Sequence, residues 1–231
     1  ATTATYHARF SAMYRQMTEQ GLADFIPDEM ERVRRQLREI TKNLESNPER
    51  ARDLKQTPTV VQSVVGRCCK PRTDMHYQSG PISTVAGHYA KEILWPNAGV
   101  GPAEIDVTGA YDAFTFTTML QLEDYGFCKK GEGGEYVSSG IMRLGGARPN
   151  NTSGGQLCEG YTHGINLVIE NVRQLRRDVD DSCPTDAEGR RQHTYNYAEG
   201  GCRQVKDCEL TANLGWGTPG YGSAMVLARG T

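Results

Sequence analysis

The chain has 231 residues, of which 37% are hydrophobic and 23% are charged, values typical of a globular protein with one large or two small domains. Its 26 lysines and arginines nearly balance 28 aspartates and glutamates, for a formal charge of −2, which argues against nucleic acid or an anionic membrane as the main partner. No stretch approaches the roughly 20 apolar residues of a membrane-spanning helix, and Ala1–Thr5 lacks the features of a signal peptide. We therefore expect a cytoplasmic protein.

Strands and helices are predicted to alternate along most of the chain. Residues 28–45 are predicted to form a long charged helix with one apolar stripe, either on a core or against a partner helix. Further helices are predicted at 82–94, 113–125 and 164–176, and strands at 59–65, within 100–107, at 208–210 and at 223–227. Residues 177–202 read as an inserted acidic loop, and 215–222 as a turn. The alternation indicates a layered α/β protein, in which strand 59–65 is buried and Ile165 and Ile169 lie on the apolar face of their helix.

The seven cysteines form no CxxC pair, so the sequence does not support a zinc ribbon or a disulfide framework. Most of them are expected to be reduced thiols. A zinc site is the alternative, and its ligands would be Cys183, His193, Cys202 and Cys208. Because these spacings match no compact metal knuckle, no metal is expected.

Three polar, glycine-rich loops are the candidate functional segments, because no common catalytic signature is complete. They span residues 110–114, 154–164 and 215–222. Glycine allows positive φ and close backbone approach, so such loops can direct amide protons at a developing oxyanion. The glycines predicted to bind substrate are Gly155, Gly160, Gly220 and Gly222.

Residues from about 99 to 176 and from about 203 to 228 resemble the C-terminal half of the thiolase superfamily. The likeness is to its sterol-carrier and lipid-transfer-protein branch. The motifs that carry it are Val100–Val107, Tyr111-Asp112-Ala113-Phe114, Leu120–Asp124, Phe127–Gly134 and Asn151-Thr152-Ser153-Gly154-Gly155. The resemblance implies a thiolase-like layered αβα fold with a mixed sheet.

The resemblance also implies a division of the chain into two regions. Residues 1–98 would be a helical and linking region with part of the thiolase-like N-terminal portion, and 99–231 the C-terminal domain with an insertion at about 177–202. The family's N-terminal half, with its acyl-accepting cysteine, has no counterpart here, and residues 45–60 read as two family segments joined. We therefore expect the sequence to span only part of the fold.

Two departures from the thiolase pattern indicate a change of chemistry. Gly160-Tyr161-Thr162 stands where a thiolase has Gly-His-Pro, and residues 215–221, which end in Tyr221, stand where it has its second cysteine. Claisen condensation and thiolysis need a thiolate and a base that generates it. Tyrosines in their place resemble the thiolase-fold retro-aldolases that cleave β-hydroxyacyl-CoA esters in steroid side-chain degradation, a reaction without an acyl-enzyme.

The resemblance implies that Tyr161 and Tyr221 form the acid/base pair. His163 would tune Tyr161, and Asp112 would orient a water or a hydroxyl. Each has a purely structural alternative: the tyrosines can be packing residues, His163 can stabilise a helix start, and Asp112 can cap a helix.

The expected function is retro-aldol cleavage of a β-hydroxyacyl-CoA, with a 17-hydroxy steroid side-chain CoA ester as the substrate that the family suggests. No cofactor is implied beyond CoA as part of the substrate. The family implies a homodimer and a small OB-fold/zinc-ribbon acyl-CoA-associated partner. Two alternatives stay open: a thiolase or acyltransferase with a cysteine outside this segment, and a non-catalytic acyl-CoA-binding scaffold subunit.

Overall fold

The computed structural model describes residues 56–69, 81, 83–179, 195–196, 200–218 and 221–230. The chain divides into two compact units, Ala1–Lys55 and Gln56–Thr231, and all described residues belong to the second. The helix predicted at 28–45 and most of the predicted insertion at 177–202 therefore lie outside the described residues. The predicted region boundary at 98/99 falls inside the second unit, because residues on both sides of it share one sheet and one core.

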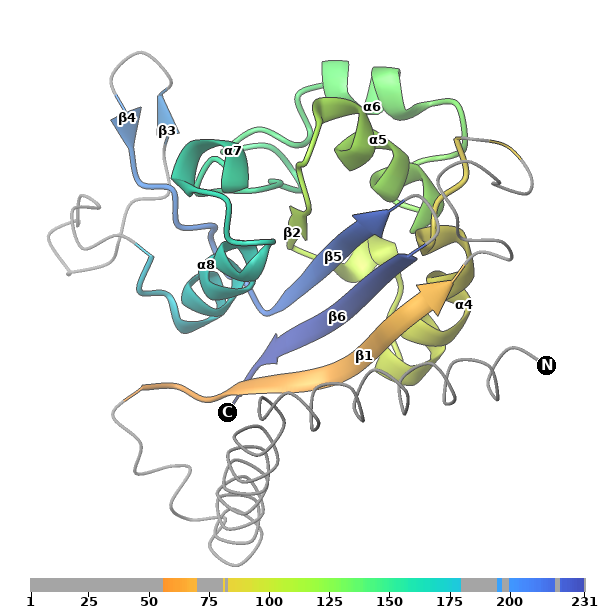
Figure 1. The fold of residues 1–231 in the computed structure, drawn as a ribbon. Coiled ribbons are helices and arrows are strands. Elements are labelled where there is room, and N and C mark those ends of the chain that lie inside the picture. Colours follow the sequence, from red (N-terminus) through yellow and green to blue (C-terminus); the bar gives the residue numbers. More distant parts are fainter. Residues whose placement is uncertain are drawn as a thin grey trace, which may run out of the picture. The chain divides into compact units, whose positions relative to one another are not determined.

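A mixed sheet forms the centre of the described part (Figure 1). Its four described strands lie in the order β1 (Thr59–Cys69), β6 (Tyr221–Arg229), β5 (Leu210–Thr218) and β2 (Val107–Ala110). Strand β6 is antiparallel to both of its neighbours, whereas β2 is parallel to β5. The carboxyl ends of β2 and β5 and the start of β6 consequently lie at the same edge of the sheet.

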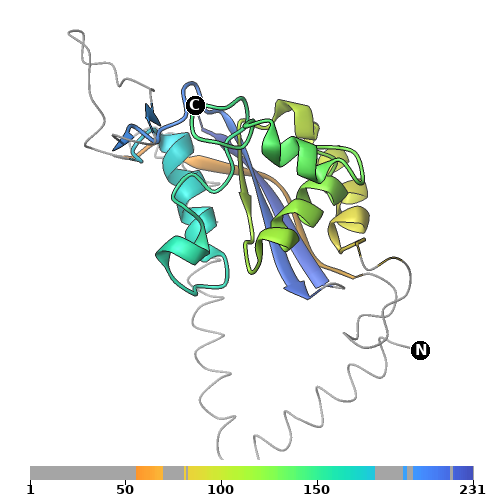
Figure 2. The same ribbon diagram turned by 90° about the horizontal axis from the view of Figure 1, so that it is seen from above.

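Helices cover both faces of this sheet (Figure 2). On one side lie α4 (Gly87–Ala98), α5 (Thr115–Asp124) and the short α6 (Gly133–Ser138), and on the other lies α8 (Ile165–Arg176). The smaller described elements are a 3-10 turn (Pro102–Glu104), α7 (Gln156–Glu159) and the pair β3 (Tyr195–Asn196) and β4 (Gly200–Gly201). The arrangement confirms the predicted layered αβα fold. No helix in the described part has the length and apolar character to cross a bilayer.

The central strand β5 shows how the two faces differ. Successive side chains of a strand point to opposite faces, and Ala212 and Leu214 enter the larger core with α4 and α5. Thr211 and Asn213 therefore face α8, although both are polar and buried. The core on the α8 side is smaller and is built around Leu175 and Leu227. This polar stretch of β5 becomes important for the candidate site.

One prediction about burial is wrong. Strand β1 was expected to be buried, but Val60, Val61 and Val64 are 48%, 57% and 60% exposed, because β6 is the only described strand that pairs with β1. The predicted apolar face of α8 is partly buried: Leu175 is fully buried and Val168 and Val172 pack against its cluster, whereas Ile165 is 56% and Ile169 is 47% exposed. The buried residues of α8 also include Glu170, Asn171 and Gln174, and their hydrogen bonds offset the cost of burial.

The predicted turn at 215–222 is shorter in the structure. Strand β5 continues to Thr218 and β6 begins at Tyr221, so that most of these residues are paired in a hairpin. The run of glycines suggested a loop, but glycine can also occupy a strand where the backbone or a side chain approaches closely. Gly215 shows this, because a Cβ there would collide with Ser223 on the neighbouring strand.

Candidate active site

Two of the three predicted loops meet at one edge of the sheet. The first follows β2, where the amide of Tyr111 donates a 2.9 Å hydrogen bond to the carbonyl of Leu214 and so prolongs the pairing with β5. The second runs through α7 to the start of α8. The two loops are about 45 residues apart in the sequence, and the fold brings them into direct contact through Asp112.

Asp112 holds the start of α7. Its carboxylate is buried and accepts hydrogen bonds from the amides of Gln156 at 3.1 Å and Leu157 at 3.3 Å. These are first-turn amides of a helix, which need an acceptor outside the helix. The helix-capping alternative is therefore the one that the geometry favours for Asp112, although the capped helix is α7 and not the helix that follows Asp112 in the chain.

Gly155 is required by this contact. Its φ of +74° is a conformation that side chains rarely adopt, and a Cβ there would collide with the Asp112 carboxylate. Gly160 ends α7 with a φ of +144° and is exposed. Both glycines thus shape the loop before α8, and their predicted contact with substrate stays a prediction.

Tyr161 and His163 lie together on the surface directly before α8. Their rings pack edge to face, with centroids 4.7 Å apart and an interplanar angle of 65°. Tyr161 is 75% exposed, which excludes the alternative that it is a core tyrosine. His163 has a φ of +53°, so the backbone turns sharply at this point. The predicted pairing of these two residues is consistent with this contact, while their catalytic roles stay predictions.

Tyr111 is a site residue that the sequence reasoning missed. Its side chain is 6% exposed and contacts both Gln156 and Tyr161. Burial raises the pKa of the Tyr111 phenol above its usual value, the contact with Gln156 lowers it, and the contact with Tyr161 raises it again. Tyr111 therefore stays protonated at neutral pH and can act as a hydrogen-bond donor beside Tyr161.

Tyr221 is the first residue of β6 and lies opposite Thr218 across the hairpin. Its side chain is half-buried. By strand alternation it shares the α8-facing side of the sheet with Ser223 and Met225. The neighbouring Gly222 faces the other way, where a Cβ would be 2.9 Å from that of Ala86, so its side of the strand points away from the loop before α8. Gly220 lies outside the described residues.

A cleft of about 200 Å³ opens beside these loops, between α8 and the sheet. Its walls are largely apolar, and its polar side chains are those of Tyr111, His163, Asn213 and Ser223. The remaining lining residues are Val64, Gly109, Gly164, Ile165, Leu167, Val168, Leu214, Gly215, Ala224 and Met225. Tyr161 lies at the side of this cleft through its contacts with Tyr111 and His163. Tyr221 is two residues from the lining residue Ser223 on the same face of β6.

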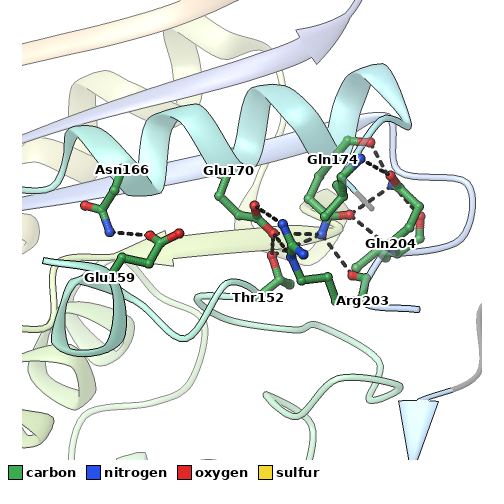
Figure 3. Close-up of polar contacts among 9 residues, drawn as sticks. Thr152, Glu159, Asn166, Glu170, Gln174, Arg203 and Gln204 are labelled. Carbon is green, nitrogen blue, oxygen red and sulfur yellow. Dashed lines mark hydrogen bonds and ion pairs between the residues drawn. The ribbon is translucent and has the colours of Figure 1, made fainter. Parts of the chain in front are cut away.

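A buried polar network fixes α8 relative to the loop before α7 (Figure 3). Glu170 accepts hydrogen bonds from Thr152 at 2.7 Å and from Arg203 at 3.2 Å. Gln174 bridges from this carboxylate to Gln204, whose side-chain amide donates to the Gln174 side-chain oxygen at 2.9 Å. The network therefore joins the segment before α7, helix α8 and the segment before β5, and of these three α8 lines the cleft.

Two of the described thiols, those of Cys128 and Cys208, are poorly suited to act as nucleophiles. Burial, with help from nearby carboxylates, raises the pKa of Cys128 to about 11 and raises that of the buried Cys208 even further. Cys158 is free and exposed on α7, and Cys202 is disulfide-bonded. The free cysteines Cys128, Cys158 and Cys208 agree with the expectation that most of the cysteines are reduced, and Cys202 is an exception to it. That bond removes Cys202 from the alternative zinc site, whose Cys183 and His193 lie outside the described residues. Within the described ranges, no group of three acidic, histidine or cysteine side chains could hold a metal.

Comparison with known families agrees with this architecture. Residues 73–194, more than half of the chain, match the family described as thiolase C-terminal domain-like. The chain belongs to this family. The predicted resemblance to the thiolase superfamily is thereby confirmed, and the loops around the cleft are loops of a thiolase-type C-terminal domain.

Two of the relatives with assigned names are steroid-cleaving enzymes. The 17-hydroxy-3-oxo-4-pregnene-20-carboxyl-CoA lyase of Mycobacterium tuberculosis is 40% identical over 129 residues, which is 55% of this chain and 33% of that protein. The steroid side-chain-cleaving aldolase of Thermomonospora curvata is 35% identical over 133 residues, again 55% and 33%. The chain thus spans about a third of the length of these relatives.

The solved structure of the Ltp2-ChsH2(DUF35) aldolase has the same thiolase-type fold. It superposes with a TM-score of 0.64 and 28% identity, covering 78% of this chain and 42% of that chain. The superposition covers more of this chain than the sequence matches with the two relatives do. The likeness therefore extends beyond the segments that those matches align.

Proposed function

We propose that this chain is part of an aldolase that cleaves the bond between Cα and Cβ of a β-hydroxyacyl-CoA thioester. The observation that carries the proposal is the composition of the cleft: tyrosine and histidine side chains line or flank it, and no described lining residue is a cysteine. Thiolysis and Claisen condensation need a thiolate at this place. Retro-aldol cleavage needs only groups that move protons and hold an enolate.

The proposed substrate is a 17-hydroxy steroid side-chain CoA ester. Its support is the activity for which the two relatives are named, and they are 40% and 35% identical over about half of this chain. A cleft of about 200 Å³ is smaller than the roughly 300–1,000 Å³ of pockets that enclose whole ligands. We therefore propose that it receives the thioester end of the substrate and that the steroid rings lie outside it.

The proposed acid/base pair is Tyr161 and Tyr221. A base removes the proton of the β-hydroxyl, the Cα–Cβ bond breaks, and its electron pair moves into the thioester, which becomes an enolate. The ketone then leaves, and an acid returns a proton to Cα. Tyr111, protonated and in contact with Tyr161, would orient that phenol, and His163 would support its ring from the edge.

Asp112 has a positioning role in this proposal. Because its carboxylate accepts two amides of α7, it serves to hold the loop that carries Tyr161 and does not need to orient a water. Gly155 and Gly160 would act through the same loop. This assignment replaces the role of orienting a water or a hydroxyl that the resemblance implied for Asp112.

No cofactor is needed for the proposed reaction, because the cleavage is redox-neutral and CoA enters with the substrate. For the assembly we propose a homodimer that also binds a small OB-fold/zinc-ribbon acyl-CoA-associated protein. The support is the similar aldolase structure, whose name pairs Ltp2 with ChsH2(DUF35).

The experiment is to incubate the full chain, with and without such a partner, with 17-hydroxy-3-oxo-4-pregnene-20-carboxyl-CoA. Mass spectrometry should detect the 17-ketone and propionyl-CoA, the two fragments of Cα–Cβ cleavage. Tyr161→Phe and Tyr221→Phe should each slow the reaction about 10²–10⁴-fold, as for lost acid/base groups. Tyr89→Phe is the matched control, because Tyr89 also packs edge to face on a histidine, His88, at 5.1 Å, but on α4.

Three outcomes would contradict the proposal. If neither product forms, both with and without the partner protein, the lyase reaction is excluded. Inactivation by iodoacetamide that acyl-CoA prevents would indicate a thiolase or acyltransferase with a reactive cysteine. Tight acyl-CoA binding without products would indicate a scaffold subunit.

A further inference from the structure

Asn213 carries a buried amide that the protein itself does not use. The residue lies in the middle of β5, is 6% exposed and lines the cleft on the α8 side. Neither its side-chain oxygen nor its side-chain nitrogen has a hydrogen-bond partner among the described residues. Leaving such a group unpaired is costly, so an unsatisfied amide facing a cleft indicates a ligand that completes it.

The amide of Asn213 is closely surrounded by its neighbours. Gly109 is its partner in the parallel pairing with β2, and a Cβ on Gly109 would be 2.8 Å from the Asn213 nitrogen. Asn171 on α8 approaches the same point, but its amide already donates to the Ala212 carbonyl at 3.3 Å. The Asn213 amide therefore occupies the space that a side chain at Gly109 would need, and Asn171 does not satisfy this amide.

The apolar walls and the volume of the cleft limit which chemical group can bind beside Asn213. The wall near Asn213 is apolar and is formed by Leu167, Val168 and Met225. A polar group bound there is therefore small and belongs to an otherwise apolar part of the ligand. A cavity of about 150 Å³ can hold benzene, and about 200 Å³ holds a small acyl group and its thioester. The carbonyl oxygen of that thioester is an acceptor that the Asn213 nitrogen can serve.

We propose that the Asn213 side-chain amide donates a hydrogen bond to the carbonyl oxygen of an acyl-CoA thioester. This inference rests on the proposed function and adds a catalytic residue to it. When the Cα–Cβ bond breaks, its electron pair moves onto that carbonyl oxygen as an enolate. The oxygen returns to a carbonyl when Cα takes up a proton. A donor fixed in an apolar cleft stabilises the negative charge strongly, because little reorganisation is needed.

The position of Asn213 is compatible with proton transfer in the same cleft. Tyr111 and His163 line it as well, and both contact Tyr161. A thioester whose oxygen binds at Asn213 therefore directs its Cα and Cβ into the space that these residues border. The amide and the phenols would then act on opposite ends of one enolate.

The test measures binding and needs no turnover. The probes are propionyl-CoA and S-propyl-CoA, a thioether in which CH₂ replaces the carbonyl. The wild-type chain should bind propionyl-CoA about tenfold more tightly than S-propyl-CoA, as expected for one buried hydrogen bond. Binding should also shift the NMR signals of one side-chain NH₂ pair, identified as Asn213 by its absence from the variant. The Asn213→Leu variant should bind the two probes about equally tightly. Its melting temperature should not be lower, because the substitution removes an unpaired polar group.

Thr211→Val is the matched control. Thr211 lies two residues earlier on the same face of β5, is fully buried and also has a side-chain oxygen without a partner, but it does not line the cleft. It should keep the tenfold preference. In the steroid-cleavage assay, Asn213→Leu should reduce kcat about 10²–10³-fold, as for a lost oxyanion donor.

The outcomes separate this inference from the proposed function. If the wild type cleaves the steroid ester but shows no preference for the carbonyl, the role of Asn213 is wrong and the proposed function stands. The same holds if Asn213→Leu keeps the preference. If the wild type neither binds nor cleaves any CoA ester, the proposed function is wrong, and the inference fails with it.

Discussion

Substitution of Glu170 by glutamine should strongly destabilise the fold. The Glu170 carboxylate is 3% exposed and accepts hydrogen bonds from Thr152, Gln174 and Arg203 (Figure 3). Glutamine keeps the size of the side chain but removes its charge and turns one acceptor into a donor. That donor would face either the Arg203 guanidinium or the Thr152 hydroxyl.

The expected cost follows from burial. Breaking a buried ion pair costs about 3–5 kcal/mol. The Arg203 side chain is 27% exposed and keeps part of its hydration, so Glu170→Gln should cost about 3 kcal/mol, near the lower end of that range. In a domain of this size, that corresponds to a melting temperature lower by about 6–12 °C.

Urea denaturation followed by circular dichroism measures this difference, provided that the slope of the transition is unchanged. Glu159→Gln is the matched control. Glu159 is exposed at the end of α7 and accepts one hydrogen bond, from Asn166 at 2.6 Å. It should change stability by less than about 0.5 kcal/mol. A loss below about 1 kcal/mol for Glu170→Gln would refute the view that this network holds α8 in place.

Three further outcomes are expected. Iodoacetamide should modify Cys158 before Cys128. Cys128 has a pKa of about 11, and because only its thiolate reacts, its rate should rise about tenfold for each pH unit between about 8 and 10. Peptide mass mapping would contradict this prediction if both cysteines reacted alike at pH 8. Gly155→Ala should lower the free energy of unfolding by at least about 2 kcal/mol, because its Cβ meets Asp112. Gly131 has a φ of +90° and open space around it, so Gly131→Ala should cost only about 1 kcal/mol of strain. Equal midpoints of urea denaturation for the two variants would argue against the collision. Tyr111→Phe should remove a late step, above about pH 10, from the ultraviolet titration of the tyrosines, because burial raises the pKa of Tyr111; an unchanged titration curve would contradict that assignment.

Local patterns in the sequence were sufficient for much of the fold. The apolar periodicity of 113–125 and 164–176 correctly predicted α5 and α8 within two residues. The alternation with strands predicted a layered α/β fold, and the resemblance implied its mixed sheet. Exposure was predicted less well. Whether a β-branched strand such as β1 is buried depends on how many neighbours it has in the sheet, and periodicity does not report that.

The candidate site was only partly accessible from the sequence. The loop before α8 was recognised from its departure from the thiolase pattern, and the contact between Tyr161 and His163 agrees with the predicted grouping. Tyr111 lies in the predicted functional loop 110–114 but was given no role, and Asn213 was missed because it lies between the predicted strand at 208–210 and the predicted turn at 215–222. The contact of Asp112 with α7 depends on a loop more than 40 residues away, which no local signal indicates.

The contact between Asp112 and Gly155 makes two distant positions depend on each other. A larger residue at 155 can fit only if the side chain at 112 becomes shorter, and a shorter residue at 112 leaves the first amides of α7 without their acceptor. The two positions should therefore vary together among homologous sequences, as a pair that tolerates double exchange better than either single one. Selection for a new acyl group would then reshape this loop in coupled steps, and directed evolution of the site should randomise both codons at once.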